Sequence, residues 1–347
     1  MPAQALLTVL HAGDELPPSR SMPTLPTIYY ICHVPPSTGG ERVNLQHVAS
    51  LAGLGMRAVA LVNAASETDQ LRLPYEVLAP GRQFSAADIV VIPEFYRDAF
   101  RHFATTPCRR IIHNQGPFLS FRGYDSIAEM NTDGLSAGLT CSNFGRHLMQ
   151  RMGSDLEWHI VTPFLPAFFS PDASASAAPR KLQIAYMPDK RPREAPVIKA
   201  LFQHRYPGFA HVAWVPITNV SRQRCAEIMA ESAVFASLSW LDGLGLPPLE
   251  AMASGCLVYG FDGHGGSDFA TPDNGLWIAE GDHDAFADAL ARSLTMAQDG
   301  AVDGERQRRI SAGRATATAY SRERFDVELH AAWRTILGPA WGDYCQP

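Results

Sequence analysis

The most informative segment of this chain is Ser239–Cys256, SWLDGLGLPPLEAMASGC. It places two carboxylates, Asp242 and Glu250, eight positions apart across a glycine-rich turn. The pair Pro247-Pro248 predicts a helix that starts directly after the turn, because the first helical positions need no backbone donor. Glu250 is then expected in the first turn of this helix, where the positive end of the helix dipole stabilises a carboxylate.

The same stretch has the parts of a binding site. The backbone N–H groups that follow Gly245 stand at a helix start, so they lack intrahelical acceptors and can receive a phosphate. Carboxylates accept hydrogen bonds from hydroxyl groups. An acid, a flexible turn, a helix start and a second acid together indicate a site for a phosphorylated ligand that is rich in hydroxyl groups.

Outward from this stretch, the chain alternates between strand-like and helix-like segments. The predicted strands are rich in β-branched and aromatic residues: Thr27–Val34, Ala58–Val62, Ala87–Ile92, Arg110–His113, Leu139–Ser142, Lys181–Met187, Ala210–Pro216, Ala233–Leu238 and Cys256–Phe261. Helices are predicted at 41–53, 143–152, 195–205, 222–231 and 285–296, and over most of 304–337. This alternation predicts an α/β fold with doubly wound parallel sheets.

The length of 347 residues is typical of two domains. The segment Phe164–Lys181 interrupts the alternation with prolines and a run of serine and alanine, which is typical of a linker. We therefore expect a loose head at 1–26, a first Rossmann-like domain at 27–165, a linker at 166–181 and a second Rossmann-like domain at 182–318. The remaining residues, 319–347, form a C-terminal helix.

Composition argues against several classes of protein. The formal net charge is −6 and no run of five basic residues occurs, so nucleic-acid binding is not expected. The six cysteines are scattered, which argues against a disulfide framework or a zinc site and favours a reducing cytoplasm. No run approaches the roughly 18 apolar residues of a membrane span, and residues 1–26 lack the pattern of a secretory signal.

The complete string Ser239–Cys256 resembles the donor-binding signature of retaining glycosyltransferases of the GT-B fold, in the family 4 (group 1) set. The family pattern is an acid, Gly-Phe-Gly-Leu-Pro, a Glu and then Ala-Met-Ala-x-Gly. Asp242 stands where the first acid is normally Glu, and Leu244 stands where Phe is common. The resemblance implies GT-B architecture with an interdomain cleft. The second domain would bind the donor, the first mainly the acceptor, and the C-terminal helix would cross back to the first domain.

The resemblance also implies roles for residues of the second domain. Glu250 is expected to hold the ribose hydroxyls of a nucleotide-sugar donor, and Asp242 to hold hydroxyls of the sugar. Backbone amides at Gly245–Leu246, with Lys190 or Arg191, would stabilise the departing diphosphate, because cations offset its growing negative charge. For Lys190 and Arg191 the alternative is a pair of solvated loop cations.

Two features of the first domain match the family as well. Gly39 and Gly40 precede a helix at Glu41, where backbone amides can approach the donor diphosphate closely. An ordinary strand-to-helix turn is the alternative. His113 ends a predicted strand, and the resemblance places a histidine here near the reacting sugar. It could donate a hydrogen bond to a sugar hydroxyl or to the diphosphate, or it could simply cap its strand.

The resemblance therefore implies an enzyme, a hexosyltransferase-type glycosyltransferase. It would move a sugar from a nucleotide sugar to a glycan or lipid-linked acceptor with retention of configuration. Neither a metal ion nor a cofactor is expected beyond the donor itself. A cytoplasmic location is expected, with peripheral contact at the inner membrane face left open. Two alternatives stay open: a catalytically silent relative that binds nucleotide sugar, and a nucleotide-sugar epimerase of the same fold. Donor base, sugar, acceptor and oligomeric state are not predicted.

Overall fold

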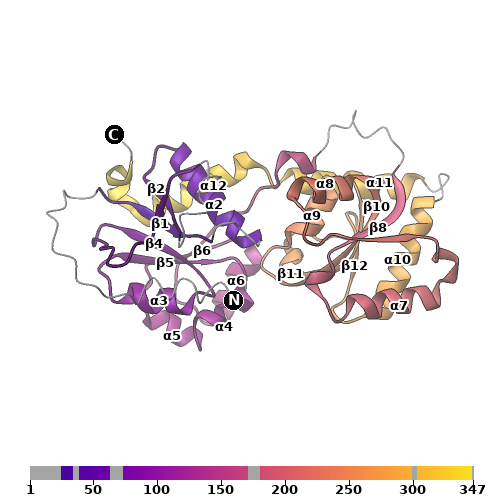
Figure 1. Ribbon diagram of the computed structural model, residues 1–347, viewed down its shortest axis with the longest axis horizontal. Coiled ribbons are helices and arrows are strands. Elements are labelled where there is room, and N and C mark those ends of the chain that lie inside the picture. Colours follow the sequence, from indigo (N-terminus) through magenta and orange to yellow (C-terminus); the bar gives the residue numbers. More distant parts are fainter. Residues whose placement is uncertain (1–24, 34–38, 63–72, 171–179, 299–302, 346–347) are drawn as a thin grey trace. The chain divides into compact units, whose positions relative to one another are not determined.

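The computed structural model describes residues 25–33, 39–62, 73–170, 180–298 and 303–345. The chain divides into two compact units (Figure 1). Unit 1 contains Met1–Pro163 together with Phe325–Pro347, and unit 2 contains Phe164–Arg324. Each unit has its own parallel sheet and its own hydrophobic core. The described part of the predicted linker therefore belongs to unit 2, where Phe169 is buried.

Unit 1 is built on a seven-stranded sheet in the order β3-β2-β1-β4-β5-β6-β7, and all its strand pairs are parallel. The strands are β1 (Ile28–Ile31), β2 (Ala58–Val62), β3 (Tyr75–Val77), β4 (Ile89–Pro93), β5 (Arg109–Asn114), β6 (Ala137–Thr140) and β7 (Trp158–Ile160). Strands β1 and β4 are buried along their whole length, because helices cover both faces of a parallel sheet.

Helices cover the two faces of this sheet (Figure 1). They are α2 (Gly39–Gly53), α3 (Arg97–Ala104), α4 (Ser120–Gly123), α5 (Ile127–Thr132), α6 (Asn143–Arg151) and α12 (Arg322–Leu337), with η1 at Pro117–Leu119 and η7 at Gly338–Tyr344. On one face, Phe100, Phe103 and Met130 pack into the core. On the other, His47 of α2 contacts Phe325 of α12, and Trp333 of α12 donates a hydrogen bond to Tyr30 of β1.

Unit 2 is built on a five-stranded parallel sheet in the order β12-β11-β10-β8-β9. The strands are β8 (Lys181–Tyr186), β9 (Ala213–Pro216), β10 (Ser232–Asp242), β11 (Leu257–His264) and β12 (Leu276–Ile278). The helices are α7 (Ala195–Arg205), α8 (Arg222–Glu231), α9 (Leu246–Ala253), α10 (His283–Gln298) and α11 (Asp303–Thr318). Short 3-10 turns are η2 (Ala167–Phe169), η3 (Pro188–Lys190), η4 (Pro207–Phe209) and η5 (Gly265–Asp268).

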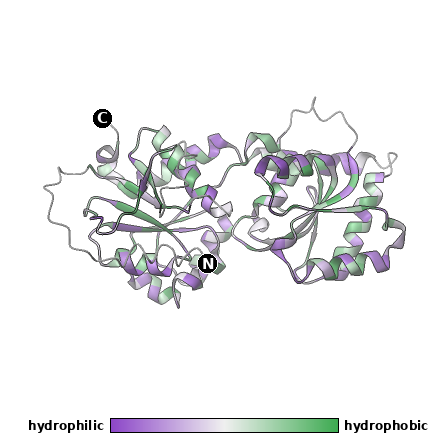
Figure 2. Cartoon of the chain, viewed as in Figure 1, coloured by the Kyte–Doolittle hydropathy of each residue, from purple (hydrophilic) through white to green (hydrophobic). Residues whose placement is uncertain are grey.

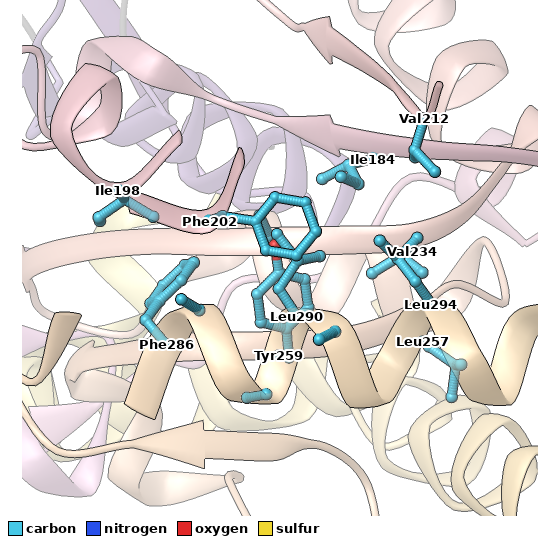
Figure 3. Packing of buried hydrophobic residues seen from close by; sticks show 14 of the residues in the cluster. Ile184, Ile198, Phe202, Val212, Val234, Leu257, Tyr259, Phe286, Leu290 and Leu294 are labelled. Atoms are coloured by element: carbon cyan, nitrogen blue, oxygen red, sulfur yellow. The ribbon is translucent and has the colours of Figure 1, made fainter. Parts of the chain in front are cut away.

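Aromatic and branched side chains fill the core of unit 2. Phe202 of α7 and Phe286 of α10 pack with Tyr259 of β11 in one buried cluster, and Leu290 and Leu294 extend it along α10 (Figure 3). In Figure 2 the strands of both sheets are largely hydrophobic, whereas the helices mix hydrophobic and hydrophilic residues. Helix α3, for example, buries Ala99, Phe100 and Phe103 on one side and leaves Arg101 exposed on the other.

The predicted α/β class and the two Rossmann-like units are confirmed. The strands that the sequence did not predict are β3, β7 and β12. Each has three residues and lies at a sheet edge, so each lacks the buried run that marks a central strand. None of the helices among the described residues is both long enough and apolar enough to cross a bilayer.

Candidate active site

The turn between β10 and α9 is held in a tight, left-handed conformation. Strand β10 runs four residues beyond its predicted end, to Asp242, with a register irregularity between Ser239 and Asp242. Gly245, the N-cap of α9, has φ of 89°, which favours glycine. A Cβ atom on Gly265 would lie 2.4 Å from the backbone carbon of Gly243, so this neighbouring loop also requires glycine.

Strained backbone conformations also occur beside this turn. Among the described residues, the non-glycine residues with positive φ are Asn219, Leu241 and His264, and the last two lie at the ends of paired strands. This conformation costs about 1–2 kcal/mol for a residue with a Cβ atom. Strained residues of this kind cluster at binding and catalytic sites. The ends of β10 and β11 are therefore the candidate functional site of unit 2.

Asp242 and Lys190 form an ion pair at this edge of the sheet. Nζ of Lys190, in η3, lies 2.5 Å from Oδ1 of Asp242. The Asp242 side chain is 15% exposed and that of Lys190 is 35% exposed. Oδ2 of Asp242 is buried and has no hydrogen-bond partner among the described residues. An enclosed carboxylate oxygen without a donor is costly, so this atom is suited to accept a hydrogen bond from a ligand.

Glu250 occupies a different position from the predicted one. Helix α9 begins at Leu246, so Glu250 lies in its second turn, and the expectation of a first-turn carboxylate is wrong. The side chain is 1% exposed, and its Oε1 lies 2.6 Å from a guanidinium nitrogen of Arg222 at the start of α8. Within the first three helical positions, Leu246 carries the one backbone N–H, since Pro247 and Pro248 have none.

Arg191 is buried and paired with acids of unit 2. Its side chain is 1% exposed and makes a bidentate pair with Glu280, with two N···O distances of 2.6 Å. It also bonds Glu194 and the backbone carbonyl of Ser239, and it lies over the ring of Phe261. Arg191 thus holds the end of β10 in place. Of the two predicted cations, Lys190 has the more exposed charge.

Gly39 and Gly40 form the first residues of α2 in unit 1. A Cβ atom on Gly40 would lie 3.2 Å from Oε1 of Gln115, and Nε2 of Gln115 donates to the Gly40 carbonyl at 3.0 Å. The loop after β5 therefore packs directly on the start of α2. Because Gly40 has no side chain, Gln115 can reach both its carbonyl and the side chain of Asn44.

His113 lies at the end of β5 and is completely buried. Its Nδ1 is 2.7 Å from Oδ1 of Asn44, and its ring centroid is 4.5 Å from that of His47. Its other ring nitrogen, Nε2, has no hydrogen-bond partner among the described residues. Burial lowers the pKa of His113 to about 3, so the imidazole is neutral at physiological pH.

Glu94 is a further buried acid beside this loop. It follows β4, and its backbone N–H donates to the carbonyl of His113 on the neighbouring strand at 3.3 Å. Burial raises the pKa of the Glu94 carboxyl to about 7, although backbone N–H groups of Glu94, Gln115 and Gly116 bond to it and act in the opposite direction. Its Oε2 has no partner in the described part of the chain.

Sequence reasoning missed Arg222, Asn44, Gln115 and Glu94. One signal was present for Arg222, because a cation in the first turn of a helix opposes the helix dipole and so needs a nearby anion. Gln115 follows His113 by two positions, and Glu94 follows a predicted strand, so their places at strand ends were also signals. No sequence signal was present for Asn44, because nothing in the sequence indicates that it contacts His113, 69 positions away.

A cavity of about 480 Å³ lies elsewhere in unit 2, between β12, α10 and α11. Trp277, Arg292 and Arg309 line it, and both arginines bind Glu305. The charges of these two arginines are therefore already paired within the protein. Across the described ranges, no three His, Cys, Asp or Glu side chains come together in a metal-binding group.

Comparison with known proteins identifies the family. Residues 211–315 match the model for glycosyl transferases group 1. The chain is 31% identical over 321 residues to an alpha-1,6-glucosyltransferase of Actinobacillus pleuropneumoniae serotype 7 (strain AP76), covering 89% of this chain and 94% of the relative.

Solved structures share the fold at low sequence identity. A glycosyltransferase from Rickettsia africae ESF-5 aligns with a TM-score of 0.66 and 13% identity, over 91% of this chain and 99% of its own. Anabaena Alr3699/HepE, solved in complex with UDP and glucose, aligns with a TM-score of 0.62 and 13% identity, over 89% and 99% of the two chains. With its two parallel-sheet units, the chain has the GT-B fold, and it belongs to the group 1 glycosyltransferases.

Proposed function

We propose that this glycosyltransferase moves a glucosyl group from UDP-glucose to a hydroxyl group of a glycan or a lipid-linked glycan. The alpha-1,6-glucosyltransferase that is 31% identical supports glucose as the transferred sugar. The HepE structure in complex with UDP-glucose supports that donor. The observation that carries the proposal is the enclosed Oδ2 of Asp242, which has no hydrogen-bond partner among the described residues. It lies beside Lys190 at the end of β10, shortly before the helix that bears Glu250.

Each of these groups has a role that follows from its chemistry. Oδ2 of Asp242 accepts a hydrogen bond from a hydroxyl of the transferred sugar. Glu250, held by Arg222, accepts hydrogen bonds from the ribose hydroxyls. The ammonium of Lys190 and the N–H of Leu246 at the helix start stabilise the negative charge that builds on the departing diphosphate. In unit 1, we assign the start of α2, at Gly39 and Gly40, to the diphosphate and His113 to the transferred sugar.

The reaction breaks the bond between C1 of glucose and the diphosphate oxygen, and forms a bond from C1 to the acceptor oxygen. We propose that the acceptor attacks from the face that the diphosphate leaves, so the configuration at C1 is retained. The acceptor proton then passes to an oxygen of the departing diphosphate, and the products are UDP and the α-linked glycoside. Lys190 and the helix start supply positive charge to the diphosphate, which supports a reaction independent of divalent metal.

We place the reaction in the cytoplasm. The six cysteines form no disulfide within the described part of the chain, and five of them are buried, which suits a reducing compartment. Contact with the inner face of the membrane would follow if the acceptor is lipid-linked.

One experiment tests the donor, the acceptor and the stereochemistry of the reaction together. Purified enzyme is incubated with UDP-glucose and candidate glycan acceptors, with EDTA in a parallel reaction, and the product linkage is determined by NMR. We expect an α-linked glucoside and the same rate with EDTA. A β-linkage would overturn retention, loss of activity in EDTA would overturn metal independence, and product only from another nucleotide sugar would overturn the donor.

A further inference from the structure

A chain of hydrogen bonds in unit 1 joins the backbone of α2 to the ring of His113. It starts at the carbonyl of Gly40, which accepts from Nε2 of Gln115 at 3.0 Å. The same Nε2 donates to Oδ1 of Asn44 at 2.9 Å, and that oxygen lies 2.7 Å from Nδ1 of His113. Gln115 follows His113 on the loop after β5, whereas Gly40 and Asn44 belong to α2.

The carbonyl at one end determines where each proton in this chain lies. A carbonyl oxygen can only accept, so the Gln115 amide must direct its NH₂ group toward Gly40. The second proton of that NH₂ group points to Asn44, so Asn44 must present its oxygen there. Two acceptors cannot lie 2.7 Å apart without repulsion, so His113 must carry its proton on Nδ1. The contact of 3.4 Å between Nε2 of Gln115 and Nδ1 of His113 is therefore not a hydrogen bond, because both protons of the Gln115 NH₂ group already point to other acceptors.

His113 is therefore protonated on Nδ1 and bare on Nε2. Neutral imidazole has one donor nitrogen and one acceptor nitrogen. The buried Nε2 has no partner among the described residues and can thus accept a hydrogen bond from a ligand. A hydroxyl group can supply that donor, whereas a diphosphate oxygen is itself an acceptor and would be repelled.

The neighbouring histidine has the opposite arrangement. Nε1 of Trp333 donates to the hydroxyl oxygen of Tyr30 at 3.2 Å, and an indole N–H can act only as a donor. The single proton of Tyr30 is then free for Nδ1 of His47, 3.0 Å away. When Tyr30 donates this proton, neutral His47 carries its own proton on Nε2. The two neighbouring rings, tilted by 48° with centroids 4.5 Å apart, are thus bonded to different networks.

We propose that Gln115 and Asn44 are positioning residues that hold neutral His113 in the Nδ1–H tautomer, so that its Nε2 accepts a hydrogen bond from a hydroxyl of the transferred sugar. The identity of that hydroxyl as part of a sugar rests on the proposed function. The tautomer itself does not, because the hydrogen bonds that set it lie within unit 1. The two parts of the proposal can therefore be tested apart.

The first test measures the tautomer directly in the resting enzyme. Long-range ¹H–¹⁵N NMR on protein labelled with ¹⁵N-histidine distinguishes a protonated ring nitrogen from a bare one, and comparison with His113→Gln assigns the signals. We expect Nδ1 of His113 to be protonated and Nε2 to be bare at pH 7.5. A protonated Nε2 in the wild-type enzyme would overturn the proposal, whether or not any sugar nucleotide binds.

Variants then test whether the two positioning residues cause this tautomer. Gln115→Glu has nearly the same shape but no NH₂ group, so the Asn44 amide should reverse and present its own NH₂ group to His113. The proton should then move to Nε2. Asn44→Asp keeps an oxygen beside Nδ1 and should preserve the Nδ1–H tautomer. Gln150→Glu, an exposed change of the same type on α6, is the matched control. An unchanged tautomer in Gln115→Glu, with a normal unfolding temperature, would rule out its positioning role.

The kinetic test uses UDP-glucose as the probe. In Gln115→Glu, Nε2 becomes a donor, so we expect kcat/KM for UDP-glucose to fall at least about tenfold, while Gln150→Glu stays near the wild type. A switched tautomer with unchanged kcat/KM would show that Nε2 does not contact the sugar, and would overturn that half of the proposal. If the wild type does not use UDP-glucose, the proposed donor fails, and the NMR result still decides the tautomer.

Discussion

The ammonium of Lys190 lies 2.5 Å from Oδ1 of Asp242, and the second oxygen of the same carboxylate is enclosed without a partner in the described part of the chain. One oxygen is thus held by the protein, and we propose that the other accepts a hydrogen bond from the donor sugar. The cation that holds it is itself half-buried and can contact an anion as well. This pair places a hydroxyl acceptor next to a positive charge, which is what a sugar joined to a diphosphate requires.

The first prediction concerns this carboxylate. Asp242→Asn keeps the shape but removes the charge, so the hydrogen bond to the sugar and the pair with Lys190 are both weakened. We expect kcat/KM for the donor to fall about 10–100-fold, since a charged hydrogen bond contributes about 1.5–3 kcal/mol. Steady-state kinetics of UDP release measures this. Asp273→Asn, an exposed change in a turn of unit 2, should stay near wild type. Equal rates for the two variants would remove Asp242 from the site.

The second prediction compares the contributions to stability of two ion pairs formed by helix α8, one with a buried acid and one that is exposed. Arg222→Met leaves the Glu250 carboxylate buried without this cation, and we expect the free energy of unfolding to fall by about 1–3 kcal/mol. Arg224→Met breaks pairs with Glu227 and Glu231 that are largely exposed, so it should cost less than about 1 kcal/mol. Urea unfolding of both variants provides the comparison. Similar losses would mean that Arg222 does not stabilise Glu250.

The third prediction tests the close approach at the turn. Gly265→Ala would place a Cβ atom 2.4 Å from the backbone carbon of Gly243, so the two loops must separate. We expect a loss of about 1–3 kcal/mol and a matching loss of donor binding, because the displaced loop precedes α9. Gly208→Ala is the control, since no atom lies within 4 Å of its added Cβ. Thermal unfolding and calorimetry with UDP measure the two effects. A fully stable Gly265→Ala protein would show that the loops are not in close contact.

The fourth prediction follows from the pKa of Glu94, which burial raises to about 7. The folded protein then holds this proton more tightly than the unfolded chain does between about pH 4.5 and pH 7. The resulting stabilisation is complete below that window and is lost as pH rises through it, by up to about 3 kcal/mol.

Glu94→Gln cannot ionise, so its stability relative to the wild type should rise over the same window. Urea unfolding at pH 5, 6, 7 and 8 measures this difference. Glu323→Gln, a change at an exposed position of α12, should show no such trend. A difference between Glu94→Gln and wild type that does not change with pH would contradict the raised pKa.

Some of the site was predictable from local sequence. Gly245 adopts a left-handed conformation before α9, and prolines follow in the first turn, as expected for the start of a helix. The alternation of apolar runs with amphipathic segments predicted both sheets, because central parallel strands are buried on both faces. Glu250 was predicted in the first turn but lies in the second, because the helix begins at Leu246, one residue before the proline pair. The predicted functional roles all stay predictions: those of Asp242, His113, Lys190, Glu250, Gly39, Gly40, Arg191, Gly245 and Leu246.

Local sequence was enough to predict the central strands and main helices of both units, the turn at Gly245 and membership of the glycosyltransferase family. The pairing of charges, by contrast, depends on contacts between residues far apart in the chain. The tertiary structure buried Arg191 against Glu280, 89 positions away, and left Lys190 more exposed, although the two cations are adjacent in sequence. It also set the tautomer of His113 through Asn44, 69 positions away. Desolvation and hydrogen bonding depend on which distant groups come within about 3 Å, and folding alone determines that.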